Sequence, residues 1–207
     1  MATDDPLNTE DQQVEQIIAA VGESVPRFVA SLVVEGSERS AIIVGAAQLD
    51  DSLERLLLKV LKPQSDKNDR LFGVNGPLRD TYPKINLAYR LGIIDDDVEQ
   101  ALQLVRKIRN DFAHSLESAS LSDSPHRDRL NELVNLCEKN EVYRGMRKDL
   151  TDLLKREDLA EEVERGQFSE SLLDFASVMY VVLYSLISIS AISRRVQPGH
   201  RAFLDSS

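Results

Sequence analysis

The chain has 207 residues, of which 42% are hydrophobic, and this is enough for one domain with a continuous core. Its formal net charge of −10 argues against a basic surface large enough to neutralise a series of phosphates, so direct sequence-specific DNA binding is not expected. The single cysteine, Cys137, excludes an intramolecular disulfide, and no Cys/His cluster suggests a metal site. A cytoplasmic protein without metal or cofactor is the simplest expectation.

Apolar residues recur at helical spacing along almost the whole chain, and no run of alternating β-branched residues predicts a strand. The sequence therefore predicts an all-α fold, a single-domain helical bundle of about seven to eight helices. We expect a disordered tail over residues 1–10, the helical domain over residues 11–196 and a flexible tail over residues 197–207. The acidic and polar start of the chain argues against a secretory signal.

In the first half of the domain, turn residues separate four predicted helices and one loop. Gly22 ends a short amphipathic helix, and Pro63 ends a long one. The polar loop that follows Pro63 carries an apolar pair, Leu71 and Phe72, which we expect to pack on the core. The predicted elements of this half are helices at Gln12–Val21, from Ser24 onward, at Glu38–Leu61 and at Thr81–Leu91, the last capped by Thr81, and a loop at Pro63–Pro77.

The second half contains four more predicted helices, separated by a serine-rich loop and a charged connector. Three consecutive aspartates, Asp95–Asp97, suit the positive end of the helix dipole and mark the first start. Ser124 and Pro125 mark the next start, as N-cap and first helical residue. The predicted elements are helices at Asp95–Glu117, from Ser124 to Cys137, at Tyr143–Leu154 and at Ser171–Arg195, with the charged connector at Lys155–Arg165.

The last predicted helix contains an uncharged stretch, Phe175–Ile192, whose length is at the lower edge of a membrane span. Four serines interrupt it, and two acidic residues, Glu170 and Asp174, precede it. It has no flanking aromatic belt, and no second apolar segment occurs in the sequence. We therefore predict a buried helix at the centre of a bundle and no membrane association.

One short sequence, RNDFAH from Arg109 to His114, combines residue types in a way that resembles a chemical site. Projected on a helix at about 100° per residue, Arg109 falls in the middle of an apolar face. That face consists of Val98, Leu102, Val105, Phe112 and Leu116. A buried guanidinium is costly unless a carboxylate pairs with it, and Asp50 likewise falls inside the apolar face of the long helix. One prediction is therefore a structural ion pair between Asp50 and Arg109 that fixes the register of the two helices.

His114 follows Arg109 by five positions, about 140° around the helix, so the two side chains do not share a face. Asn110 and His114 are four positions apart and share the polar face, where the Asn amide can orient the imidazole ring. A single solvated histidine on a polar face is the simpler alternative. If the stretch carries chemistry, its candidate catalytic residues are Arg109, Asn110 and His114.

The pattern Arg109-Asn110-x-x-x-His114 resembles the RxxxxH signature of HEPN-domain ribonucleases. The resemblance implies an all-α protein in which the Arg and the His of two protomers meet at a dimer interface. It also implies metal-independent RNA cleavage through the ribose 2′-OH, with His114 as general acid and base and Arg109 stabilising the phosphate.

Between Ala41 and His114 the chain contains four blocks, VGAAQLDDSLERLL (Val44–Leu57), LFGVNGPL (Leu71–Leu78), KINLAYRLGII (Lys84–Ile94) and RKIRNDFAH (Arg106–His114). In their order, spacing and glycine placement these blocks resemble the mannitol operon repressor family. The resemblance implies a bacterial, cytoplasmic, helical protein associated with repression of a sugar-alcohol uptake operon. It also implies a family without a recognisable helix-turn-helix, so that repression would proceed through a protein partner.

Three functions are therefore open. We prefer a transcriptional regulator that acts through a protein partner or a homodimer, because the resemblance on which it depends is the longest. The alternative is a toxin-like endoribonuclease of HEPN type, with a composite site at a dimer interface and RNA as substrate, because every residue of its motif is present. A purely structural interaction module is the third, so enzymatic activity stays undecided.

Overall fold

The computed structural model describes residues 23–34, 37–63, 69–115, 119–156 and 169–194. Within these ranges the chain forms seven helical segments and no strand, which confirms the predicted all-α fold. The segments are residues 23–34, α2 (Glu38–Val60), α3 (Thr81–Arg90), α4 (Asp96–His114), α5 (His126–Cys137), α6 (Glu141–Leu154) and α8 (Glu170–Ile192). The predicted tails, the predicted helix at Gln12–Val21 and the charged connector from residue 157 on lie outside the described residues.

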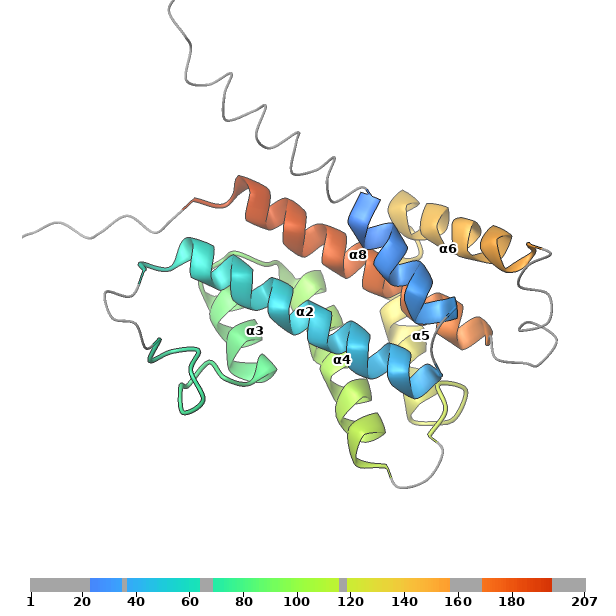
Figure 1. Ribbon diagram of the computed structural model, residues 1–207, viewed down its shortest axis with the longest axis horizontal. Coiled ribbons are helices and arrows are strands. Elements are labelled where there is room, and N and C mark those ends of the chain that lie inside the picture. The colour runs from blue at the N-terminus through green and yellow to red at the C-terminus, as the bar shows by residue number, and fades with distance from the viewer. Residues whose placement is uncertain (1–22, 35–36, 64–68, 116–118, 157–168, 195–207) are drawn as a thin grey trace, which may run out of the picture.

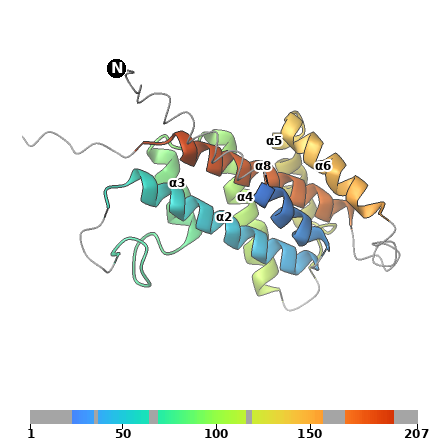
Figure 2. The same cartoon turned by 45° about the horizontal axis from the view of Figure 1, so that its top comes forward.

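Helices α2 and α8 lie side by side at the centre of the molecule and run in the same direction (Figure 1, Figure 2). Helix α4 packs against α2, and α3 packs against both of them. Helix α5 contacts α4 and α8, and α6 covers the outer side of α8 (Figure 1). The α2–α8 pair therefore separates a side that carries α3 and α4 from a side that carries α6.

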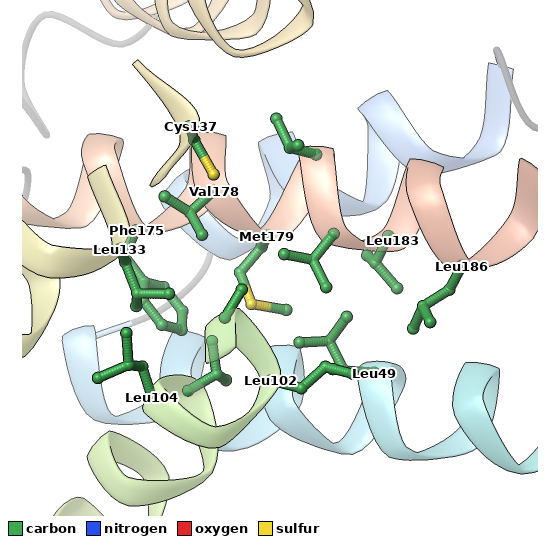
Figure 3. Close-up of a cluster of buried hydrophobic side chains, with 14 of the residues drawn as sticks. Leu49, Leu102, Leu104, Leu133, Cys137, Phe175, Val178, Met179, Leu183 and Leu186 are labelled. Atoms are coloured by element: carbon green, nitrogen blue, oxygen red, sulfur yellow. The ribbon is translucent and has the colours of Figure 1, made fainter. Parts of the chain in front are cut away.

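Side chains from α2, α4 and α8 interdigitate in the core (Figure 3). Leu49, Leu102 and Met179 come from these three helices in turn, and all three are buried. The helices approach closely at Gly45, where a Cβ would lie 3.1 Å from the terminal methyl of Met179. One continuous cluster of buried hydrophobic residues includes members of all seven helical segments.

Helix α8 is long and apolar enough to cross a membrane by length and composition, and its most apolar window has a mean hydropathy of 2.0. Half of that window is buried inside the protein, and core helices of this kind pass the same test. Eleven residues of α8 are buried, and the helix packs against α2, α5 and α6. These contacts are those of a central core helix, as the sequence predicts.

Helix α4 begins one residue after the predicted Asp95, because Asp95 is the N-cap, and its carboxylate accepts a backbone N–H of the first turn. Two predicted caps are each displaced by one residue. Asp80 rather than Thr81 precedes α3, so Thr81 is itself the first helical residue. Pro125 rather than Ser124 precedes α5, so that helix begins one residue later than predicted.

Of the apolar pair Leu71 and Phe72 in the segment between α2 and α3, only one residue packs on the core. Phe72 is partly buried and packs on the core, as predicted, whereas Leu71 is exposed. The Asp69 carboxylate accepts the backbone N–H groups of both residues, at 2.8 Å from Leu71 and 3.2 Å from Phe72. At Gly76 a Cβ would lie 2.1 Å from the Leu71 carbonyl oxygen. The second glycine of the LFGVNGPL block is therefore required by a close backbone approach.

Candidate binding cleft between helices α2, α3 and α4

Two residues in the middle of the RNDFAH sequence, Asp111 and Phe112, contact α5 and hold α4 against it. Phe112 is fully buried, and its ring lies 4.8 Å from the His126 ring, measured between centroids. The Asp111 carboxylate forms an ion pair with Arg129 of α5 and lies 3.7 Å from Nδ1 of His126. This part of the sequence therefore has a structural role.

Arg109 and Asn110 line a cleft of about 220 Å³ that opens between α2, α3 and α4. The wall from α2 is mostly apolar and includes Asp50, while α3 contributes Thr81. The complete lining is Ile43, Ala46, Ala47, Leu49, Asp50, Thr81, Leu102, Val105, Arg106, Arg109 and Asn110. Polar groups from three helices thus converge on one concave surface.

Two guanidinium groups, from Arg106 and Arg109, lie one helical turn apart at this cleft. Arg106 Nε donates to the Gln103 side-chain oxygen at 3.0 Å, and its guanidinium carbon lies 5.0 Å from the centre of the Tyr82 ring. Arg109 Nη1 donates to the Asn110 side-chain oxygen at 3.1 Å. In the described part of the chain neither guanidinium has a carboxylate partner, so both retain N–H donors for other acceptors.

The predicted ion pair between Asp50 and Arg109 is not formed, because Asp50 pairs with Lys84 of α3 instead. Nζ of Lys84 lies 2.7 Å from Oδ2 of Asp50 and 2.6 Å from Oε2 of Glu54. Lys84 is only 1% exposed, whereas Arg109 is exposed. Asp50 and Glu54 are four residues apart on α2, so one buried ammonium group from α3 serves both carboxylates.

The environment of Lys84 keeps it charged. Burial alone would lower the pKa of Lys84, because desolvation disfavours the ammonium ion. The hydrogen bonds and the charges of Asp50 and Glu54 outweigh burial and raise the pKa of Lys84 above its ordinary value. Lys84 therefore holds α3 on α2 as a cation and is not a nucleophile at neutral pH.

Arg109 is exposed because the buried face of α4 is centred elsewhere than predicted. The buried residues of α4 are Ala101, Leu102, Leu104, Val105, Ile108 and Phe112. The predicted apolar face leaves out Ala101, Leu104 and Ile108. Because these three residues are buried, the centre of the observed face lies farther from Arg109 than predicted. Arg109 consequently lies at the edge of the buried face of α4, where it lines the cleft and is exposed to solvent.

His114 lies apart from the cleft. It is the last residue of α4, it is exposed, and it is not among the residues that line the cleft. Among the described residues, the Asn110 side-chain oxygen accepts a hydrogen bond from Arg109 and not from His114. Within one chain, the structure thus brings Arg109 and Asn110 together and leaves His114 separate from them.

Lys84 and His126 are structurally important residues that sequence reasoning missed. A signal for Lys84 exists, because it precedes the buried Ala88 by four residues and so lies on the apolar face of α3. The carboxylates of Asp50 and Glu54, spaced for one face of α2, are the matching signal. His126 has no such signal, because its burial depends on how α4 approaches α5.

Together, the fold and the cleft define an all-α helical bundle with a polar, arginine-containing concavity on its α3–α4 side. Across the described ranges, no group of three or more His, Cys, Asp or Glu side chains is arranged to hold a metal ion. No protein-family model matches the chain, and no curated protein matches it.

In fold, the chain is similar to a chain of the MtlR–HPr complex from Escherichia coli, where MtlR is the mannitol operon repressor. The similarity covers 82% of this chain and 100% of that chain, with a TM-score of 0.53 and 20% sequence identity. At this level of identity, the likeness shows a shared helical fold.

The four blocks that resemble the mannitol operon repressor family lie close together in the structure. Val44–Leu57 lies within α2, Leu71–Leu78 lies between α2 and α3, Lys84–Ile94 includes the end of α3, and Arg106–His114 is the second half of α4. Helices α2, α3 and α4 pack against one another. The cleft is therefore built from the same part of the chain as the resemblance.

Proposed function

We propose that this chain is a cytoplasmic transcriptional regulator of the mannitol operon repressor type, which acts through a protein partner rather than through a DNA-binding motif of its own. The observation that carries the proposal is the likeness in fold to a chain of the MtlR–HPr complex, which extends over the whole of that chain. The sequence blocks around the cleft support the same assignment from a different kind of observation.

The partner that the neighbour suggests is HPr, because the neighbour was solved in complex with it. We propose the HPr of the same organism as the first candidate partner of this chain. Self-association into a homodimer is compatible with such a complex. The net charge of −10 also favours a protein partner over a polyanion, since a polyanion requires many basic contacts.

No observation favours the ribonuclease alternative. Its motif residues Arg109 and His114 occupy different surfaces of α4, and only Arg109 lines the cleft. The Asn110 side chain, which the motif would use beside His114, is bonded to Arg109. The regulator is therefore the function that we propose.

We expect the purified protein not to shift the promoter DNA of a sugar-alcohol uptake operon in native gels at physiological salt, because an acidic chain gains little from counterion release. A helix-turn-helix repressor on its own operator serves as the positive control. A tight shift by this protein alone that survives an excess of non-specific DNA would contradict partner-mediated action.

A further inference from the structure

We propose that a cavity between the helix of residues 23–34, α2 and α8 binds a small aromatic carboxylic acid that carries a hydroxyl group. The cavity has a volume of about 430 Å³, which lies within the range of roughly 300–1,000 Å³ for small-molecule sites. Among the described residues it shares no lining residue with the cleft between α2, α3 and α4, and the proposal does not depend on the identity of a protein partner. The lining is Ser24, Val25, Phe28, Gln48, Ser52, Arg55, Leu183, Leu186, Ile187 and Ser190.

One side of the cavity is apolar. Leu183 and Leu186 are buried, and both extend from α8 toward α2 (Figure 3). Ile187 follows them on α8, and Phe28 adds an aromatic ring from the helix of residues 23–34. An apolar body gains free energy when it is buried against this side, and a flat ring can also pack against the ring of Phe28. The occupant that fits this side therefore has an aromatic body.

The opposite side, formed by α2, contains a buried hydroxyl group without a hydrogen-bond partner. Ser52 is only 8% exposed, yet its Oγ makes no hydrogen bond within the described ranges. A serine inside a helix can donate to the backbone carbonyl of the preceding turn, as the buried Ser177 does to Leu173 at 2.7 Å. A buried hydroxyl group that lacks a partner is unfavourable. A ligand in the cavity supplies the partner that the described part of the protein does not.

Gln48 lies one turn before Ser52 on α2 and lines the same side. Its side-chain amide likewise has no hydrogen-bond partner in the described part of the chain. Serine and glutamine side chains each offer a donor and an acceptor, and a ligand hydroxyl group can both donate and accept. A site of this kind rejects an analogue that lacks the hydroxyl group, because its own polar groups then remain unpaired.

The charge of the ligand follows from Arg55, which alone carries a charge among the described lining residues. Its Nε lies 2.9 Å from Oδ2 of Asp51, so the terminal guanidinium nitrogens keep their donors for a carboxylate. Lys59, one turn further along α2, adds a second cation beside the cavity, where its Nζ donates to the backbone carbonyl of Ser190. Two cations and one carboxylate at this end favour an anionic group on the ligand.

The spacing along α2 determines how the two polar groups of the ligand are arranged. Arg55 follows Ser52 by three residues and Gln48 by seven, which places it roughly 4.5 and 10.5 Å farther along the helix axis. A carboxylate and a hydroxyl group at opposite ends of one benzene ring match this separation. The simplest probe with this arrangement is 4-hydroxyphenylacetate.

The test is an NMR titration of the full-length protein with 4-hydroxyphenylacetate. We expect saturable shifts of the resonances of Gln48, Ser52 and Arg55, with a Kd of about 1 mM or tighter. Phenylacetate lacks the hydroxyl group, and 2-(4-hydroxyphenyl)ethanol lacks the carboxylate. Each of the two analogues should bind at least about fivefold more weakly than the probe. The absence of saturable shifts at these residues would overturn the proposal, and so would equal binding of the probe and phenylacetate.

Two variants separate the roles of the polar residues. Ser52→Ala removes the hydroxyl group without adding bulk, so it should abolish the preference for the probe over phenylacetate and leave phenylacetate binding unchanged. Arg55→Gln should weaken both acids by about tenfold and leave the neutral alcohol unchanged.

The matched control is Arg127→Gln, which alters an exposed arginine of α5 outside the cavity and should bind all three compounds as the unchanged protein does. Thermal unfolding checks that each variant is folded. A hydroxyl preference that persists in Ser52→Ala, or acid binding that is unchanged in Arg55→Gln, would overturn the assignment of the cavity.

Discussion

Replacing Lys84 with methionine is expected to lower the free energy of unfolding by roughly 2–3 kcal/mol, which is less than the about 3–5 kcal/mol for breaking a fully buried pair. The expected loss is smaller than for a fully buried pair because the side chains of Asp50 and Glu54 are 29% and 34% exposed and retain some solvation. Urea denaturation measures the change, since its linear extrapolation gives the free energy directly.

The matched control for this variant is Lys107→Met, which removes the same charge from an exposed position on α4. That change should stay within about 0.5 kcal/mol, as surface substitutions usually do. If the two variants lost the same free energy of unfolding, the pairing of Lys84 with Asp50 and Glu54 would not contribute to stability.

Alkaline pH provides an independent check on the same contact. Since the pKa of Lys84 is raised in the folded protein, its stabilising contribution is fully present below the ordinary value of 10.5 and is lost as the pH rises through the folded pKa. The difference in stability between the unchanged protein and Lys84→Met should therefore be constant from neutral pH to about 10 and should shrink above that.

Phe112→Ala is expected to destabilise the protein by about 3–5 kcal/mol, because it removes a fully buried aromatic ring and leaves a cavity between α4 and α5. Arg109→Ala and His114→Ala, in the same six-residue sequence, should each change stability by less than about 0.5 kcal/mol. Thermal or urea unfolding of the three variants measures their stabilities and so shows which residues of RNDFAH belong to the core and which to the surface.

Arg109→Ala and His114→Ala are the controls for Phe112→Ala, since all three substitutions lie within six consecutive residues of α4. A loss of about 3–5 kcal/mol in Arg109→Ala would be the result of breaking a buried ion pair. Such a loss would contradict the exposed position of Arg109 and restore the pairing that the sequence predicts.

The helices were predictable because local signals determine them. Helical spacing and turn residues predict α2 from Glu38 to Leu61, and the structure has Glu38–Val60. The acidic run Asp95–Asp97 predicts the start of α4 to within one residue, since carboxylates suit the positive end of the helix dipole. The uncharged stretch of α8 predicts a core helix, and the structure buries it between α2, α5 and α6.

The pairing of side chains between helices was not predictable in the same way. A projection shows which face a residue occupies on its own helix, but the partner depends on which helix covers that face. The sequence pairs Asp50 with Arg109 of α4, whereas α3 brings Lys84 against it. The predicted apolar face of α4 lies too close to Arg109, because it leaves out Ala101, Leu104 and Ile108.

The candidate site was predictable in part. The sequence indicates Arg109 and Asn110, and the structure places both at the cleft. It also indicates His114, which lies elsewhere on α4. The sequence indicates Thr81 only as a helix cap and Arg106 only as part of the RKIRNDFAH block, and the packing of three helices brings both to the cleft.

The most direct test of partner-mediated regulation is a calorimetric titration of the purified full-length protein with HPr from the same organism. Saturable binding with a Kd of about 1 μM or tighter is the predicted result, with the complex co-eluting in size-exclusion chromatography. An absence of both binding heat and co-elution, with folded proteins and at low as well as physiological salt, would contradict the assignment.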